Sequence, residues 1–171
     1  MEARLSSPTP WMGALVCALL FLPPVAPSAT AAENPLWGKQ CSKQADGKPD
    51  TCALQQFVIA QPGNRQLLLT QLGYNGPEAK PRLLLVAPLG ILLTKGISFG
   101  IDDKKPLTVP FETCNSSGCL SIIDMDEAAL DQFRKGNVLK VRYYLMGDEE
   151  KPLDLPIKLD GLSAALKSIA P

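Results

Sequence analysis

The sequence predicts a mainly β protein, either an antiparallel β-sandwich or a partly closed barrel of about eight strands, with one or two short helices. Three observations favour this class. Several segments alternate apolar and polar residues, which is typical of strands that bury one face. The 171 residues include 16 prolines and 13 glycines, a composition that suits turn-rich β domains better than helical bundles. The predicted connections are short, which favours antiparallel pairing.

Residues 1–32 have the pattern of a secretory signal peptide. Arg4 supplies a positive charge, an apolar run spans residues 11–22, and the small residues at 29–31 fit a signal peptidase site. The apolar run is short for a permanent membrane-spanning helix. We therefore expect export, followed by a single mature domain of residues 33–171.

Two alternatives for the N-terminus stay open. The apolar run could remain attached as a short uncleaved anchor, or Cys17 could be a lipoprotein cysteine. Val16 opposes lipidation, because a small residue is needed directly before a lipidated cysteine. The apolar run also continues past Cys17, which favours ordinary cleavage further along the chain.

Four cysteines follow the predicted leader, namely Cys41, Cys52, Cys114 and Cys119. An even number of cysteines in an exported chain indicates disulfides, and four cysteines allow three pairings. Turn-forming residues lie between the members of each local pair. We therefore favour the bridges Cys41–Cys52 and Cys114–Cys119.

A redox pair and a four-cysteine zinc site are the alternatives to structural disulfides. Thioredoxin-type redox pairs have two intervening residues, whereas four residues separate Cys114 from Cys119. The spacing of Cys41 and Cys52 is too wide for the tight cysteine pairs that are typical of structural zinc.

Three segments in the first half of the chain, residues 54–60, 65–72 and 82–87, are almost continuously apolar. Such runs are typical of central strands, so we expect both of their faces to be covered. Residues 61–64, with the sequence Gln-Pro-Gly-Asn, predict a hairpin turn between the first two segments.

Four later segments show clear period-two alternation: residues 97–102, 107–112, 138–145 and 153–160. Pro110 and Pro156 fall at outward positions of two of these segments. Because proline has no backbone N–H to donate, these two strands should lie at sheet edges or carry bulges.

Two short helices complete the pattern. Asp124 or Asp126 can cap a helix over residues 127–135, and Gly136 is placed to end it. Residues 162–169 predict a second helix, because their apolar residues recur at helical spacing.

The charge balance and the absence of histidine exclude several function classes. Lys and Arg total 17 and Asp and Glu total 17, so the net charge is zero and a general nucleic-acid-binding surface is not expected. A chain without histidine has no Ser-His-Asp triad, no Cys-His dyad and no histidine-ligated metal. We therefore expect no enzymatic activity, no cofactor and no metal.

The remaining candidates for chemistry are carboxylates and one tyrosine. Asp102 fits an ordinary turn, and the acidic residues at 124–127 fit a helix start better than a calcium loop. Tyr144 lies on the polar face of the segment 138–145, which makes it the candidate contact residue for a partner.

Several motif residues follow one another along the chain in a characteristic order. They are Trp37 with Cys41, Cys52, the Pro-Leu-Gly-Ile segment at 88–91, Gly96, Asp102, Cys114 with Gly118 and Cys119, and Gly161 with Leu162. In this order they resemble the invasion-associated locus B family of exported α-proteobacterial proteins, over residues 37–169. One departure is that Pro35 and Leu36 precede the tryptophan where the family pattern has Gly-Asp, which leaves the start of the first strand open.

The resemblance implies a small secreted β-rich domain, located in the periplasm or associated with the outer membrane. In some pathogens the family is linked to entry into host cells, and it carries over no catalytic residue. We expect a non-enzymatic binding or adhesion module of the cell envelope. Its partner would be an envelope or host-surface protein, not nucleic acid, and the cleaved chain would not be an integral membrane protein. The alternatives are a structural accessory subunit of an envelope complex and, less favoured, a thiol-redox factor.

Overall fold

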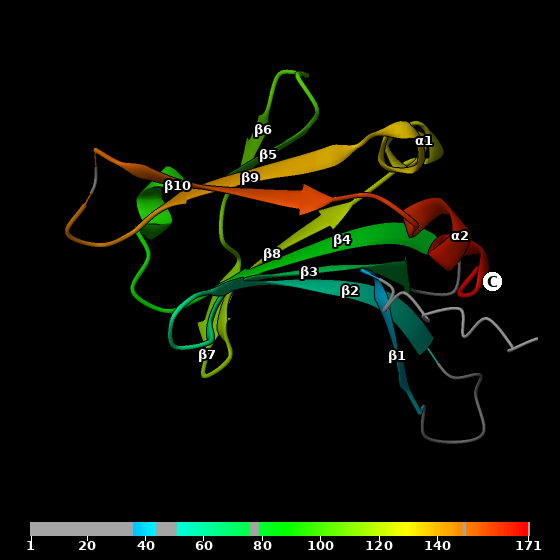
Figure 1. Ribbon diagram of the computed structural model, residues 1–171, viewed down its shortest axis with the longest axis horizontal. Coiled ribbons are helices and arrows are strands. Elements are labelled where there is room, and N and C mark those ends of the chain that lie inside the picture. The colour runs from blue at the N-terminus through cyan, green and yellow to red at the C-terminus, as the bar shows by residue number, and fades with distance from the viewer. Residues whose placement is uncertain (1–35, 44–50, 76–78, 149, 171) are drawn as a thin grey trace, which may run out of the picture. The chain divides into compact units, whose positions relative to one another are not determined.

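Two antiparallel β-sheets that face each other form the fold of this computed structural model (Figure 1). The structure describes residues 36–43, 51–75, 79–148 and 150–170, which belong to one unit, Asn34–Pro171. The predicted signal peptide, residues 1–32, lies outside the described residues. The β-sandwich prediction is confirmed, with ten strands among the described residues instead of about eight.

The larger sheet has six strands in the order β1-β2-β3-β4-β8-β7. These strands are β1 (Gly38–Ser42), β2 (Thr51–Ala60), β3 (Arg65–Asn75), β4 (Lys80–Ala87), β8 (Gly118–Asp124) and β7 (Thr113–Asn115). Residues 61–64 turn between β2 and β3, which pair antiparallel as predicted.

The smaller sheet has four strands in the order β10-β9-β5-β6. They are β10 (Pro152–Lys158), β9 (Val138–Tyr144), β5 (Ile97–Ile101) and β6 (Leu107–Val109). Pro156 lies in β10, and Pro110 directly follows β6. Both strands are edges of their sheet, so the prediction from the two prolines is confirmed.

The alternation of apolar and polar residues does not predict three of the described strands, β1, β7 and β8. β1 and β7 have five and three residues, too few to show a period. β8 lies inside the larger sheet, but Ser121 occupies one of its buried positions. The Ser121 hydroxyl donates to the carbonyl oxygen of Pro110 at 2.8 Å, which satisfies this buried polar group.

Helix α1 (Glu127–Lys135) begins and ends where the sequence predicts. Asp126 caps it, because its carboxylate accepts the N–H of Ala129 at 2.7 Å. Gly136 follows the last turn, and a Cβ at this position would collide with the Ile101 side chain. The helix therefore needs glycine there to pack closely against β5.

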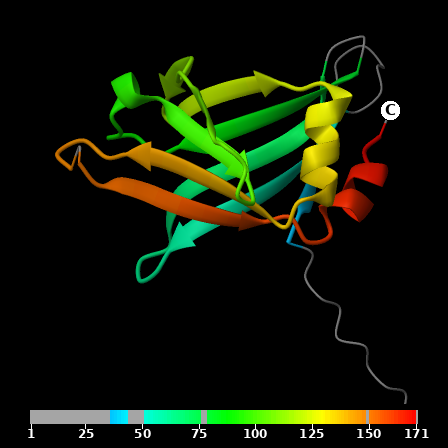
Figure 2. The ribbon, with the colours of Figure 1, turned by 90° about the horizontal axis from the view of Figure 1, so that it is seen from above.

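Two shorter helical segments complete the described part of the fold, η2 (Leu93–Lys95) and α2 (Leu162–Lys167). α2 ends two residues before the predicted 169. The N–H groups of Ser168 and Ile169 bond to carbonyls three residues back, which is the tighter pattern of a helix end. Figure 2 shows α1 and α2 side by side at one end of the sheets.

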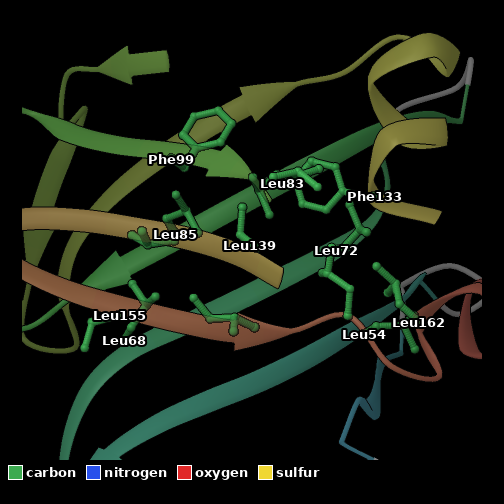
Figure 3. Packing of buried hydrophobic residues seen from close by; sticks show 14 of the residues in the cluster. Leu54, Leu68, Leu72, Leu83, Leu85, Phe99, Phe133, Leu139, Leu155 and Leu162 are labelled. Atoms are coloured by element: carbon green, nitrogen blue, oxygen red, sulfur yellow. The ribbon is translucent and has the colours of Figure 1, made fainter. Parts of the chain in front are cut away.

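The core lies between the inward faces of the two sheets (Figure 3). Leu54, Leu72, Leu83 and Leu85 enter it from the larger sheet, and Phe99, Leu139 and Leu155 enter it from the smaller one. Phe133 of α1 and Leu162 of α2 close one end. Burial of these side chains supplies the main driving force for folding.

Two side-chain hydrogen bonds among the described residues hold the two layers together, one between the sheets and one from Trp37, which directly precedes β1. The Tyr143 hydroxyl, on β9, donates to the carbonyl of Leu67 on β3 at 2.8 Å. Burial raises the pKa of Tyr143 to about 12, so this donor keeps its proton at neutral pH. The Trp37 indole N–H donates to the carbonyl of Lys158 at the end of β10, at 3.2 Å.

The prediction that residues 54–60, 65–72 and 82–87 are covered on both faces is wrong. One face of β2, β3 and β4 packs against the smaller sheet. On the opposite face Phe57 is 45% exposed and Leu69 and Leu84 are half-buried, whereas Val86 is buried. No described helix or strand packs against this face (Figure 1).

Asp102 has a larger structural role than the ordinary turn that the sequence indicates. Its carboxylate accepts the backbone N–H of Asn137 at 3.1 Å and that of Val138 at 3.0 Å. In return, the Asp102 N–H donates to the Val138 carbonyl at 2.9 Å. Asp102 thus joins the end of β5 to the start of β9.

We predict that Asp102→Ala lowers the free energy of unfolding by about 1–3 kcal/mol, because it removes the acceptor of two backbone N–H groups. Urea denaturation followed by circular dichroism measures the change. Asp103→Ala is the matched control: Asp103 is fully exposed and contacts only Lys140 in an ion pair among the described residues, so stability should stay unchanged. Equal effects of the two substitutions would contradict this assignment.

Two buried hydroxyls flank Leu85 in one row of the larger sheet. Thr70 on β3 and Ser121 on β8 both pair with Leu85, and both are fully buried. Ser121 donates to Pro110, whereas the Thr70 hydroxyl has no hydrogen-bond partner among the described residues.

We predict that Thr70→Val raises the free energy of unfolding by about 1 kcal/mol, because the shape is kept while an unsatisfied hydroxyl is removed from the core. Ser121→Ala should lower it by a similar amount, because it leaves the Pro110 carbonyl unpaired. Urea denaturation measures both changes, provided that the dependence of the unfolding free energy on urea concentration is the same in the variants and the wild type. A loss of stability in Thr70→Val would show that its hydroxyl is satisfied in solution.

Candidate functional site

The outward face of the smaller sheet forms an open groove with a volume of about 690 Å³. Its centre is β9, where alternation sends Leu139, Val141 and Tyr143 into the core and leaves the even-numbered residues outside. We call this depression the outer groove. Its main side chains are Ser98 of β5, Lys140, Arg142 and Tyr144 of β9, and Asp154 and Pro156 of β10.

A guanidinium–carboxylate pair lies in the middle of the outer groove. Arg142 of β9 is directly opposite Asp154 of β10. The Arg142 Nε donates to Oδ1 of Asp154 at 2.6 Å, and Nη2 donates to Oδ2 at 2.9 Å. The hydrogen bond raises the pKa of Arg142 and lowers the pKa of Asp154, so both groups stay ionised at neutral pH.

Further polar pairs lie beside this central pair. Ser98 and Thr108 share a hydrogen bond of 2.7 Å between their hydroxyls. Lys140 Nζ donates to Oδ1 of Asp103 at 2.9 Å. The groove therefore presents hydrogen-bond donors and acceptors held next to each other, with the positive charges of Lys140 and Arg142 each matched by a carboxylate.

An aromatic ring marks one end of the outer groove. Tyr144 is half-buried, in contrast to its fully buried neighbour Tyr143, so the structure places it on the polar face of β9 as predicted. The ammonium of Lys95, carried by η2, lies 5.3 Å from the centre of the Tyr144 ring. This cation–π contact holds the ring in place without covering it completely.

A loop bounds the other end of the groove at Gly100. A Cβ at Gly100 would lie 3.2 Å from the Lys104 carbonyl oxygen and 3.2 Å from the Cα of Pro106. Glycine thus allows residues 102–106 to lie close to β5. Sequence reasoning missed this contact, because nothing in the local pattern shows which loop approaches an isolated glycine.

The acidic residues at 124–127 do not converge on one point. Asp124 pairs with Arg82 at 2.6 Å, Asp126 caps α1, and Glu127 contacts Arg134 at 3.1 Å. Among the described residues, no group of three or more Cys, Asp and Glu is arranged to hold a metal ion.

The four cysteines form two disulfides, Cys41–Cys52 and Cys114–Cys119, in the pairing that the sequence favours. Each bridge joins residues that are directly opposite on neighbouring strands. One lies at the β1 edge of the larger sheet and the other at the β7 edge, so the four sulfurs do not meet at one site. Two disulfides fit a protein that is exported to an oxidising compartment.

Within the described part of the chain, no helix is long and apolar enough to cross a membrane.

Comparison with known proteins identifies the family. Residues 37–170 match the family model described as invasion associated locus B (IalB) protein. The chain is 34% identical over 136 residues to invasion protein B of Bartonella bacilliformis, which covers 78% of this chain and 71% of that protein. It is 28% identical over 133 residues to an invasion protein B homolog of Brucella abortus, with 78% and 75% coverage.

A solved structure has the same fold. The crystal structure of invasion associated protein B from Bartonella henselae superposes with a TM-score of 0.68 at 27% sequence identity. The match covers 78% of this chain and 90% of that chain. The match of the family model to most of the chain, together with the similar proteins and the shared fold, shows that this chain belongs to the invasion associated locus B family.

Proposed function

We propose that the protein is an exported, non-enzymatic binding module of the cell envelope that contacts its partner through the outer groove. The observation that carries this proposal is the open groove on the smaller sheet, in which the Tyr144 ring lies beside the fixed Arg142–Asp154 pair. Binding sites typically combine an aromatic contact surface with a few well-placed polar groups.

The charge state of Asp154 argues against a role as a general acid near neutral pH. A carboxylate that acts as a general acid near neutral pH needs a raised pKa. The pKa of Asp154 is lowered instead, because its carboxylate accepts hydrogen bonds from Arg142. Asp154 is therefore suited to hold Arg142 in position and to accept hydrogen bonds from a ligand.

The family and the disulfides support a location in the periplasm or at the outer membrane. The Bartonella and Brucella relatives carry the name invasion protein B, which favours an envelope or host-surface protein as the partner. The predicted leader agrees with the oxidising compartment that the two disulfides require.

We predict that Tyr144→Ala weakens partner binding tenfold or more, because a tyrosine in a binding site is a frequent energetic hot spot. The measurement uses fluorescently labelled protein titrated onto cultured epithelial cells and, separately, onto outer-membrane vesicles of the producing bacterium. Binding to the cells indicates adhesion, whereas binding to the vesicles alone indicates an accessory subunit of the envelope.

Met146→Ala is the matched control, since Met146 is 69% exposed two residues beyond Tyr144 and does not line the groove. Its binding and melting temperature should equal those of the wild type. Unchanged binding by both Tyr144→Ala and Arg142→Ala, with the fold intact, would refute the assignment of the groove as the contact site.

A further inference from the structure

The outward face of the larger sheet is apolar across its inner strands. Phe57 of β2, Leu69 of β3, Val86 of β4 and Leu120 of β8 lie in one row across the sheet, and Leu84 of β4 and Ile122 of β8 lie in the next. We call these six residues, of which Val86 is buried, the outer sheet face. Because the outward side of an antiparallel sheet in a two-layer domain is commonly polar, this apolar face indicates a further contact.

The same side of the sheet carries both a projecting side chain and a hollow. Phe57 is 45% exposed. A hollow of about 330 Å³ lies near Gly73, with Leu84 and Ile122 in its lining. Gly73 is directly opposite Ala53, and a Cβ at Gly73 would lie only 2.9 Å from the Ala53 Cβ, so this position admits no side chain.

The Phe57 ring and the part of the hollow beside Gly73 lie two residue rows apart along β2. Ala53 and Phe57 are four residues apart on β2, which corresponds to about 13 Å along the strand. Their side chains lie on the same side of the sheet, because their spacing is even. A twofold axis between the two features would place each Phe57 over the hollow of the other copy.

The charges beside the outer sheet face favour a neutral, apolar occupant. Arg82 and Asp124 lie next to Leu84 and Ile122 and neutralise each other through a 2.6 Å contact. Gln55 and Gln71, which face outward in the row of Leu84, are uncharged. A polyanion or a charged peptide would find little electrostatic attraction here. A second copy of the chain would present the same apolar face and would not be repelled by net charge.

The strand edges are poor alternatives for association. β10 carries Pro152 and Pro156, which donate no N–H to an added strand. β1 and β7 are short and each is tied to its neighbour by a disulfide. β6, the other edge of the smaller sheet, spans only three residues. We propose that the outer sheet face is the interface of a symmetric homodimer, in which Phe57 of each copy inserts into the hollow beside Gly73 of the other.

Sedimentation equilibrium of the disulfide-intact protein, between about 1 and 100 µM, tests this proposal. The wild type should be a dimer in this range, and Phe57→Glu should raise the dissociation constant at least tenfold. Leu107→Glu is the control, since Leu107 is 55% exposed on β6 of the other sheet, and it should leave the dimer intact.

Photo-crosslinking gives a second measurement that does not depend on the stability of a charged variant. A benzoylphenylalanine at position 57 should crosslink two copies of the purified protein, with the adduct on β4 or β8 peptides around Leu84 and Ile122. The same probe at position 107 should give no crosslink between copies.

Three results would overturn the dimer. The first is a wild-type protein that is monomeric at 100 µM, whether or not it binds lipid. The others are a dimer that persists in Phe57→Glu and crosslinks from position 57 to peptides outside the hollow. The outcome is independent of the proposed function, because Tyr144 lies on the other sheet and Tyr144→Ala should leave the dimer unchanged.

Discussion

The contact between the inward faces of the two sheets is the constraint on which the rest of the structure depends. Strand side chains alternate, so burying Leu139, Val141 and Tyr143 of β9 necessarily turns Lys140, Arg142 and Tyr144 outward. A slip of one residue would place two charged groups in the core. The outer groove is therefore a direct consequence of core packing, and the hydrogen bond from Tyr143 to Leu67 further fixes how the sheets meet.

The two disulfides stabilise the parts of the larger sheet that this core cannot hold. All of β7, and β1 from Lys39 onward, are exposed, so burial contributes little to their position. Cys41–Cys52 and Cys114–Cys119 each join an edge strand to its neighbour. Short edge strands with covalent links are a common solution in small exported domains, whose cores are limited in size.

Sequence patterns predict the elements whose signals are local. The cap at Asp126 and the glycine at 136 define α1, and alternation defines β5, β9 and β10. β8 is missed because Ser121 interrupts its apolar face, and its hydrogen bond to Pro110 depends on the fold. In the groove, the outward position of Tyr144 follows from alternation. The pairing of Arg142 with Asp154 requires the register of two strands, which sequence alone does not define.

β2, β3 and β4 are almost continuously apolar, yet they pack against the smaller sheet on one face only. A continuous apolar run indicates that both faces of a strand avoid water, but it cannot tell whether a layer of the same chain or another molecule covers the second face. The described chain covers only one face. In the proposed dimer the two larger sheets meet, so the smaller sheets and their grooves point away from the interface. Two grooves on one particle would let a weak groove contact gain avidity on a surface that displays many copies of the partner.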